Sequence, residues 1–252
     1  KIISKNKEIN SRDLALLYAA NVKKIKVYKR PTVVLIASGD ELILSDKKKN
    51  KGSVFASSLF MLDALITLSG ATCISKKIIK DKKHLIKSEL KKSLQADLII
   101  TTGGVSVGKK DLIRSSLKDL GFKEKFWKIS MKPGKPMLYG TLNNKPVFSL
   151  PGNPVSSYVC FLIFVLPYLY RKLNINKKLI SKIAYLENEA LSSNQRDSYY
   201  RGFYRIAKDK NYVKILSNQD SSLLNTLSKA NCLVLVPKSN ENIAIGKRVV
   251  TS

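Results

Sequence analysis

Histidine and cysteine are scarce in this chain of 252 residues, which has one histidine and three cysteines. A catalytic triad built on serine or cysteine uses a histidine base, but the single His84 stands in a lysine-rich stretch with no motif around it. The cysteines Cys73, Cys160 and Cys232 have apolar neighbours and no C-x-x-C spacing. We therefore expect reduced, buried thiols in a cytoplasmic protein.

Acidic residues are also few, with 18 against 46 lysines and arginines, which gives a formal net charge of +28. This charge alone would indicate nucleic-acid binding. However, the lysines are spread along the whole chain instead of forming one stripe, so we do not expect a nucleic-acid partner. A basic protein still attracts anionic substrates.

Long apolar runs are absent, because the longest, Tyr158–Leu169, has about a dozen residues and is interrupted by Pro167. We therefore expect no membrane span, and no signal peptide is recognisable. The apolar content of 44% is ample for a hydrophobic core.

Short apolar runs and amphipathic stretches alternate over the first two thirds of the chain. The pattern predicts a parallel sheet with helices on both faces, with strands near 32–37, 72–79 and 97–101 and helices near 57–69, 82–94, 111–120 and 155–170. Ligands of such sheets bind beyond the carboxyl ends of the strands, where the polar turn Ser38–Glu41 and the glycine-rich turn Gly103–Asp111 both lie. After about Lys172 only short strand-like runs follow, which predicts a small β-barrel.

The glycine-rich turn TTGGVSVGKKD, residues 101–111, comes within one letter of the phosphate-binding loop G-x-x-x-x-G-K-[ST]. Lys110 stands where that loop needs a hydroxyl for Mg²⁺, so nucleotide hydrolysis by this loop is disfavoured. A turn between a strand and a helix still presents backbone N–H groups to an anion. Another phosphate cradle is favoured over a tight turn without a ligand.

Two further turns carry groups suited to anions. In Lys132-Pro-Gly-Lys135-Pro, proline and glycine hold two ammonium groups on a stiff bend. The turn Leu150-Pro-Gly-Asn-Pro-Val-Ser-Ser157 leads into an apolar helix whose amino end can receive an anion. Turns of this kind often only terminate elements, but several in one domain favour a binding site.

Taken together, these motifs make the chain resemble molybdopterin molybdenumtransferases, the family of MoeA and the gephyrin E domain. The matching pieces occur in the family's order and spacing: Ala37-Ser-Gly-Asp-Glu-Leu42, Thr102-Gly-Gly-Val-Ser-Val-Gly108 with Asp111, Lys132-Pro-Gly-Lys-Pro136, Leu150–Ser157, Tyr200-Arg-Gly202 and Gln219-Asp-Ser221. The resemblance covers essentially the whole chain. It implies a three-layer α/β molybdopterin-binding domain at 31–172 and a C-terminal β-barrel at 173–252, with 1–30 as the remnant of an N-terminal domain.

The resemblance also implies an activity. The family inserts molybdate into adenylyl-molybdopterin, hydrolyses the adenylate with Mg²⁺ and acts as a homodimer downstream of molybdopterin adenylyltransferase. On this chain, Asp111, Lys135 and Asp40 match catalytic positions, and Asp111 matches the Mg²⁺ ligand. The positions for molybdate are Lys132, Lys135, Arg201 and Ser221. Those for the pterin and its phosphate are Ser38, Gly39, Glu41, Gly103, Gly104, Ser106, Gly108, Pro151, Gly152, Asn153 and Ser156.

The chain departs from the family pattern in two places. Lys109 stands where many relatives have an acidic residue, and Ala56-Ser57-Ser58 replaces the usual Asp-Ser-Asn. Losing a carboxylate and an amide would weaken pterin or metal binding. A non-catalytic pterin-binding or scaffold protein of the same fold is therefore the alternative hypothesis.

Overall fold

The protein is described by a computed structural model that covers residues 2–5, 7–44, 50–104, 111–176 and 181–252. The α/β part of the chain is built on a six-stranded sheet with the strand order β4-β1-β5-β9-β8-β6. The strands are β1 (Thr32–Ser38), β4 (Thr72–Ile79), β5 (Leu98–Thr102), β6 (Lys123–Trp127), β8 (Leu138–Leu142) and β9 (Lys145–Leu150). Strands β4, β1, β5 and β9 are parallel, and β8 runs antiparallel between β9 and β6. Their carboxyl ends therefore meet at one edge.

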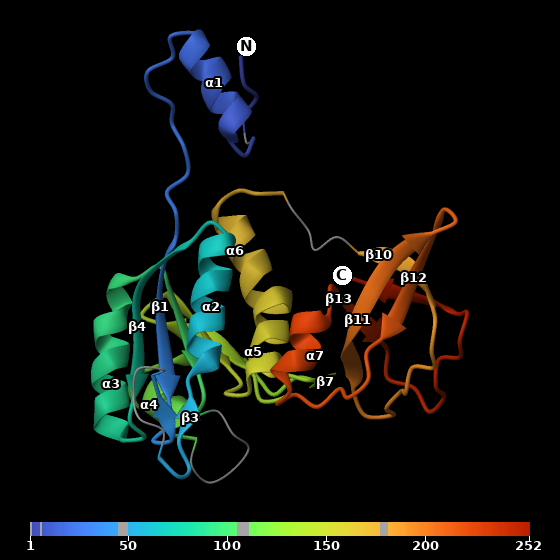
Figure 1. Cartoon of the computed structure of the whole chain (residues 1–252). Helices are drawn as coiled ribbons and strands as arrows, with labels where there is room; N and C mark the ends of the chain where they lie inside the picture. Colours follow the sequence, from blue (N-terminus) through green and yellow to red (C-terminus); the bar gives the residue numbers. More distant parts are fainter. Residues whose placement is uncertain (1, 6, 45–49, 105–110, 177–180) are drawn as a thin grey trace.

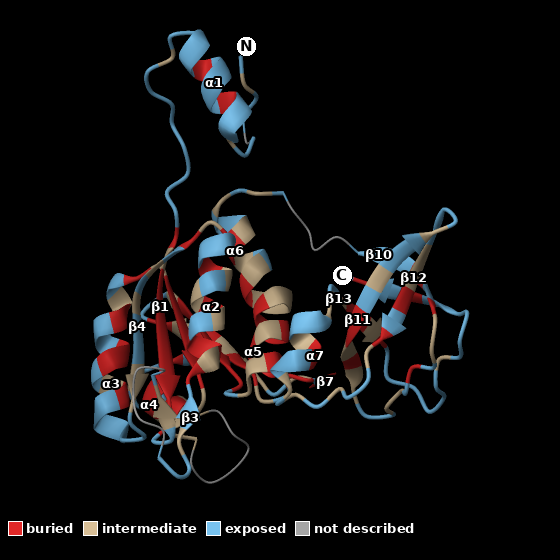
Figure 2. Cartoon of the chain, viewed as in Figure 1, coloured by how far each residue is buried: buried red, intermediate tan, exposed pale blue. Residues whose placement is uncertain are grey.

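Helices cover both faces of this sheet, as the alternating pattern predicts (Figure 1). On one face lie α2 (Ser57–Leu68) and the continuous helix α5 (Pro154–Cys160), η2 (Phe161–Val165) and α6 (Leu166–Lys172). On the other lie α3 (Lys83–Lys92), followed by the short helix η1 (Ser93–Gln95), and α4 (Leu112–Asp119). Figure 2 shows that the buried residues of these helices face the strands. The predicted three-layer α/β domain is confirmed.

Strands β1, β5 and β9 are buried on both faces because two separate cores enclose them, whereas β4 at the edge of the sheet is partly exposed. Val33 and Leu35 of β1 pack in the core under α2 and α5, whereas Val34 and Ile36 pack under α3 and α4. This alternation explains why the sequence shows an unbroken apolar run there and not a two-residue period. The central strands are thereby fixed, and the loops at their carboxyl ends start from a rigid base.

The helix from Pro154 to Lys172 is 19 residues long and is apolar enough, by length and composition, to cross a membrane. Core helices pass the same test, and Phe161, Val165 and Leu169 of this helix are fully buried in the core beneath the sheet. Pro167 does not end the helix, because a π-helical turn directly precedes α6. Such wider turns accommodate the carbonyl groups that a proline leaves without a donor. We interpret it as a core helix.

The C-terminal part is a closed five-stranded barrel, as predicted. Its strands are β10 (Lys182–Leu186), β11 (Asp197–Ala207), β12 (Lys210–Ile215), β13 (Cys232–Val236) and β14 (Arg248–Thr251). Their order is β12-β10-β14-β13-β11, and β11 also pairs with β12, which closes the barrel. A short helix, α7 (Leu224–Lys229), packs against α5. One short strand from before the barrel, β7 (Met131–Lys132), pairs with β11.

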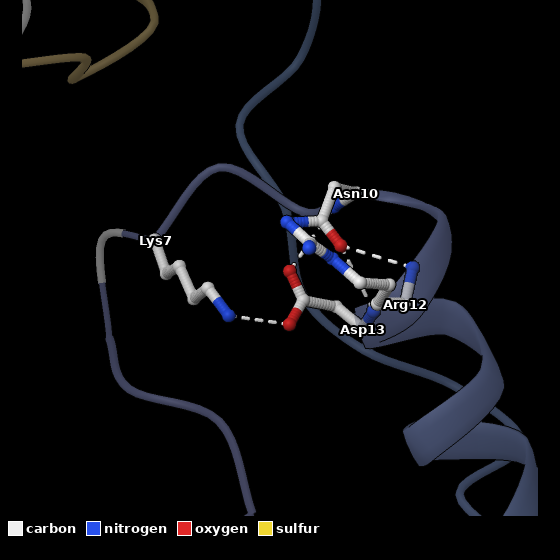
Figure 3. Close-up of polar contacts among 4 residues, drawn as sticks. All are labelled: Lys7, Asn10, Arg12 and Asp13. Atoms are coloured by element: carbon white, nitrogen blue, oxygen red, sulfur yellow. Dashed lines mark hydrogen bonds and ion pairs between the residues drawn. The ribbon is translucent and has the colours of Figure 1, made fainter.

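Two smaller features complete the chain. The two-residue strands β2 (Leu42–Ile43) and β3 (Val54–Phe55) pair in parallel beside the end of β1. At the amino end, α1 (Ser11–Ala19) lies apart from the sheet at the end of an extended segment (Figure 1). Its first turn is held by a capping box, in which the Asn10 side chain accepts from the N–H groups of Arg12 and Asp13. The Asp13 carboxylate in turn accepts from the backbone N–H of Asn10 and forms an ion pair with Lys7 (Figure 3).

Candidate functional site at the carboxyl edge of the sheet

The ends of β1, β5 and β9 approach so closely that only glycine fits between them. Gly103 has φ +81°, and a Cβ added there would lie 2.3 Å from the carbonyl oxygen of Ser38. A Cβ added at Gly152 would lie 3.1 Å from the Cα of Gly103. The three strand ends therefore expose bare backbone at one place, which is the property that a close-fitting phosphate or pterin cradle needs.

Hydrogen bonds from neighbouring elements hold this edge in shape. The hydroxyl of Thr102 donates to the carbonyl oxygen of Pro151 at 3.0 Å, and that of Ser58 donates to the carbonyl oxygen of Gly152 at 3.1 Å. Ser58 is one of the positions at which the chain departs from the family pattern. Its hydroxyl ties the start of α2 to the turn after β9, so the substituted residue keeps a structural role at the site.

The acidic turn after β1 is linked to the end of β4. The hydroxyl of Ser38 donates to the carboxylate of Asp81, and the N–H of Asp81 donates to the carboxylate of Asp40 at 3.1 Å. Asp40 and Glu41 are exposed, whereas Ser38 and Gly39 are buried beneath them. Sequence reasoning missed Asp81 as part of this network, although its position directly after a parallel strand would have indicated it.

Asp111 stands at the start of α4 beside the same edge. One of its carboxylate oxygens accepts from the N–H of Arg114 at 2.9 Å and so caps the helix. The other oxygen is buried and has no hydrogen-bond partner in the described parts of the chain. Burial raises the pKa of this carboxyl, and the hydrogen bond from Arg114 only partly opposes that effect. A carboxylate with one uncommitted, shielded oxygen is suited to bind a cation.

The position of α4 relative to β1 is fixed by Gly104, which has φ +63°. A Cβ added there would lie 2.7 Å from Cγ1 of Ile113 in α4 and 3.6 Å from Cβ of Ser38. The start of α4 therefore lies next to the end of β1, and Asp111 belongs to the same edge as the acidic turn. Of the predicted cradle residues, Ser106 and Gly108, together with Lys109, lie outside the described residues.

The remaining predicted cradle residues follow β9. Pro151 and Ser156 are buried and Gly152 is exposed. Asn153 caps α5, with its side-chain oxygen accepting from the N–H of Val155 at 3.2 Å. Among the described residues no group of three His, Cys, Asp or Glu side chains comes together. A metal at this edge would therefore depend on one or two carboxylates, as Mg²⁺ does when a substrate supplies the other ligands.

A second set of predicted residues lies where the α/β domain meets the barrel. Lys132 is in β7, whose residues pair with β11 so that Lys132 lies opposite Ser198. Arg201 is three residues further along β11, about 10 Å away at the usual rise of a strand. Lys132 at the end of β7 and Lys135 on the turn that follows are exposed, whereas Arg201 is only 1% exposed.

Arg201 is held by the loop that carries Ser221. Its N–H donates to the side chain of Gln219 at 2.9 Å, and its guanidinium donates to the carbonyl oxygen of Asp220 at 3.0 Å. The Nε atom is buried and has no partner in the described part of the structure. Burial lowers the pKa of Arg201, yet a guanidinium stays protonated at neutral pH. An immobilised cation with a free donor is suited to bind an oxyanion.

The turn that carries Lys132 and Lys135, called the lysine turn below, packs on α5. Gly134 has φ +124°, and a Cβ added there would lie 2.7 Å from Sγ of Cys160, which is fully buried. Asn153 and Cys160 mark the two ends of α5, seven residues apart, which corresponds to about 10 Å of helix. The lysine turn therefore contacts this helix about two turns beyond its amino end, where the edge lined by Gly103 and Gly152 lies.

The close approach at Gly103 allows a direct test of this geometry. We expect Gly103→Ala to destabilise the protein by roughly 1–3 kcal/mol, because the new methyl group meets the Ser38 carbonyl and the residue has a left-handed φ. The measurement is the free energy of unfolding in urea. Gly121→Ala is the matched control, since Gly121 has φ +83° but nothing within 4 Å of an added Cβ. Equal losses in both variants would mean that the contact with Ser38 contributes nothing.

Comparison with known proteins gives the site its context. Residues 34–171 match the family described as a probable molybdopterin binding domain, and residues 184–251 match the MoeA C-terminal region, domain IV. The chain is 31% identical to a molybdopterin molybdenumtransferase of Nostoc sp. over 259 residues, which cover 99% of this chain and 59% of that protein. It is also 31% identical to a molybdopterin molybdenumtransferase of Haemophilus influenzae, covering 98% of this chain and 62% of that protein.

A solved structure of a MoeA protein of molybdopterin biosynthesis from Pyrococcus horikoshii superimposes with a TM-score of 0.86 at 26% identity, covering 99% of this chain and 61% of that one. The chain thus spans about three fifths of the length of the relatives it matches. Both of its domains and their order agree with these relatives. The chain belongs to the MoeA family of molybdenum cofactor biosynthesis proteins.

Proposed function

We propose that the protein is a molybdopterin molybdenumtransferase, which inserts molybdate into adenylyl-molybdopterin and hydrolyses the adenylate. The observation that carries this proposal is Asp111, which caps α4 with one carboxylate oxygen while the other is buried and has no partner among the described residues. Family membership supports the substrate class. The reaction, its Mg²⁺ dependence and the residue roles are inferences from the site.

The residues divide between two tasks. At the glycine-lined edge, the backbone around Gly103, Gly104 and Gly152 admits the pterin phosphate, and Asp111 holds Mg²⁺, with Asp40 or Glu41 as a second ligand. Mg²⁺ supplies stabilisation of the charge that develops on phosphoryl oxygens. The buried, uncommitted oxygen of Asp111 fits this ion, because Mg²⁺ needs few protein ligands and a shielded one binds strongly.

At the other end of α5, the cations bind the tetrahedral dianion. Lys132 and Lys135 are held on one bend, Arg201 is buried beside the Ser221 loop, and each supplies N–H donors to molybdate oxygens. The separation of about 10 Å along α5 is one that an extended, adenylated pterin can bridge. In the proposed geometry, the adenylate end of the bound pterin lies at the glycine-lined edge and the molybdate lies at the lysine turn.

Three further properties come with the proposal. We expect a homodimer, as the resemblance implies, and light scattering of the full-length protein tests this. The substrate would be handed over by a molybdopterin adenylyltransferase. We expect the reaction to take place in the cytoplasm.

The deciding experiment supplies the full-length protein with adenylyl-molybdopterin, molybdate and Mg²⁺. We expect AMP release and pterin-bound molybdenum to appear together, and both to depend on Mg²⁺. A scaffold protein of the same fold would bind the pterin but release no AMP. Pterin binding without AMP release at any Mg²⁺ concentration would therefore replace the transferase by this alternative, which the two departures from the family pattern motivate.

A further inference from the structure

A hollow of about 380 Å³ lies at the edge of the sheet opposite the candidate site. It is formed where the chain enters β1, at the start of β5, at the turn between β8 and β9, and along the last turns of α6. We call it the linker hollow, and its charged lining residues are Lys29, Asp97, Lys145 and Lys172. None of these residues takes part in the proposed transferase site.

The charges of the linker hollow favour an anion. Three ammonium groups face one carboxylate, which leaves an excess of two positive charges by count of the lining residues. The Asp97 carboxylate is already engaged, because its Oδ2 accepts from both the N–H and the hydroxyl of Thr32 at 2.9 Å. These hydrogen bonds, with smaller contributions from Lys145 and Lys29, lower the pKa of Asp97. The carboxylate therefore stays ionised at neutral pH, and it offsets one of the three ammonium charges.

Two of the cations are held in place by the fold. Lys145 is the first residue of β9, directly after Asn143 and Asn144, which both have positive φ and form the tight turn that twisted hairpins require. The Nζ atom of Lys172 lies 5.7 Å from the ring of Tyr168, one turn earlier on α6. Lys145 is only half-exposed, so it loses less freedom on binding than a lysine on an open surface.

Tyr168 adds a neutral donor to the hollow. Its ring makes an edge contact with Phe148 at 5.6 Å, and Phe148 lies 4.5 Å from Tyr139, so the ring belongs to an aromatic cluster on the sheet. Burial raises the pKa of its hydroxyl to about 12. The hydroxyl therefore stays protonated at neutral pH and can donate to an anionic oxygen.

The linker hollow also joins two parts of the molecule. Lys29 belongs to the extended segment between α1 and β1, residues 20–30, whereas Lys145 and Lys172 belong to the α/β body. Apart from Val22, this segment is exposed along residues 20–30. An anion bound by all three lysines would hold the segment against the body.

We propose that the linker hollow binds a small phosphate-bearing anion, of the size and charge of pyrophosphate, and that the bound anion fixes residues 20–30 against the α/β body. The phosphate groups can belong to inorganic pyrophosphate or to a nucleoside diphosphate. The hollow contributes ammonium groups from three separate elements and a tyrosine hydroxyl.

The test measures binding of pyrophosphate and of ADP to the full-length protein by calorimetry at low ionic strength. We expect the double variant Lys145→Ala, Lys172→Ala to bind pyrophosphate roughly tenfold or more weakly, because two charge-assisted contacts are lost. The matched control is Lys91→Ala, Lys92→Ala at the end of α3, which removes the same charge elsewhere. Weaker binding of ADP than of pyrophosphate assigns the site to inorganic phosphates, and the reverse assigns it to nucleotides.

A third double variant, Lys132→Ala, Lys135→Ala, separates this proposal from the transferase site. If pyrophosphate affinity falls in this variant and not in the Lys145, Lys172 pair, the anion binds at the lysine turn and the proposal is wrong. Equal affinity in the Lys145, Lys172 pair and the α3 control overturns it as well. Melting temperatures confirm folding, and Lys145→Gln with Lys172→Gln replaces the alanine pair if that pair is unstable.

Limited proteolysis tests the second half of the proposal. Trypsin can cut after Lys23, Lys24, Lys26 and Lys29, all of which are exposed. Saturating pyrophosphate should slow these cuts severalfold in the unmodified protein and in the α3 control, but not in the Lys145, Lys172 variant. Cutting at an unchanged rate in the presence of bound pyrophosphate would show that the anion does not hold the segment.

Discussion

Replacing Asp111 by asparagine should lower adenylate hydrolysis by roughly 10²–10⁴-fold in the full-length protein while pterin-adenylate binding persists. The amide keeps the oxygen that caps α4 and accepts from Arg114, but it removes the negative charge that Mg²⁺ requires. The measurement is AMP release under single-turnover conditions across a range of Mg²⁺ concentrations.

The difference in stability between the unmodified protein and the Asp111→Asn variant depends on pH. Burial raises the pKa of Asp111 in the folded state. Ionisation of this carboxyl therefore disfavours folding as the pH rises above the pKa of the unfolded state. The penalty is absent in strong acid, where the carboxyl is protonated in both the folded and the unfolded protein. It is complete once the pH is above the pKa of the folded state. The variant should therefore melt no lower than the unmodified protein at neutral pH, and the two should converge in acid.

Asp119→Asn at the end of α4 is a matched control for the loss of a carboxylate. Asp119 is exposed and pairs with Lys83 and Lys87 on α3, away from the strand ends. AMP release should be unaffected by this change. Full hydrolytic activity in Asp111→Asn would reduce Asp111 to a helix cap and would remove the observation on which the transferase proposal depends.

The second large effect is expected at the lysine turn. Lys135→Ala should weaken molybdate binding by about ten- to a hundredfold, because a charge-assisted donor to the dianion is lost. The backbone of the turn should be unaffected, since the Lys135 carbonyl still accepts from the N–H of Ile129 at 2.9 Å. Equilibrium titration with molybdate measures the change, and the melting temperature should stay constant.

Lys125→Ala provides the control for this measurement, because Lys125 is exposed in the middle of β6 and its loss removes the same charge. Lys135→Arg keeps the charge and should retain most of the affinity. If Lys135→Ala binds molybdate as tightly as Lys125→Ala does, the turn is not the molybdate site. AMP release can then still be normal, so this outcome is distinct from failure at Asp111.

The elements of the α/β domain that the sequence predicted are those with the strongest local patterns. The unbroken apolar runs in β1 and β5 indicated strands buried on both faces, and both were found within a residue or so of the structure. The sequence did not indicate β6, whose Lys-Glu-Lys run carries little apolar pattern because the strand lies at the edge of the sheet. Pairing with β8, and not the residues themselves, makes it a strand.

The candidate site was predictable where glycine, proline and charge form local motifs. The Gly103 turn and the Lys132–Lys135 bend could be found in this way. The location of Asp81 after a parallel strand could be predicted, but the contacts of Asp81 with Ser38 and of Thr102 with Pro151 could not, because they join residues 43 and 49 positions apart. Such bonds depend on strand order, which no local pattern determines.

The pairing of β7 with β11 has a consequence for recombining these proteins. Residues 131 and 132 precede the first barrel strand, which starts at Lys182, by about fifty positions, yet they pair alongside β11, the strand that carries Arg201. A chimera joined at residue 172 would therefore combine a lysine turn from one parent with a barrel edge from the other. Exchange of the barrel between relatives should preserve oxyanion affinity only when the Met131–Pro136 segment is transferred with it.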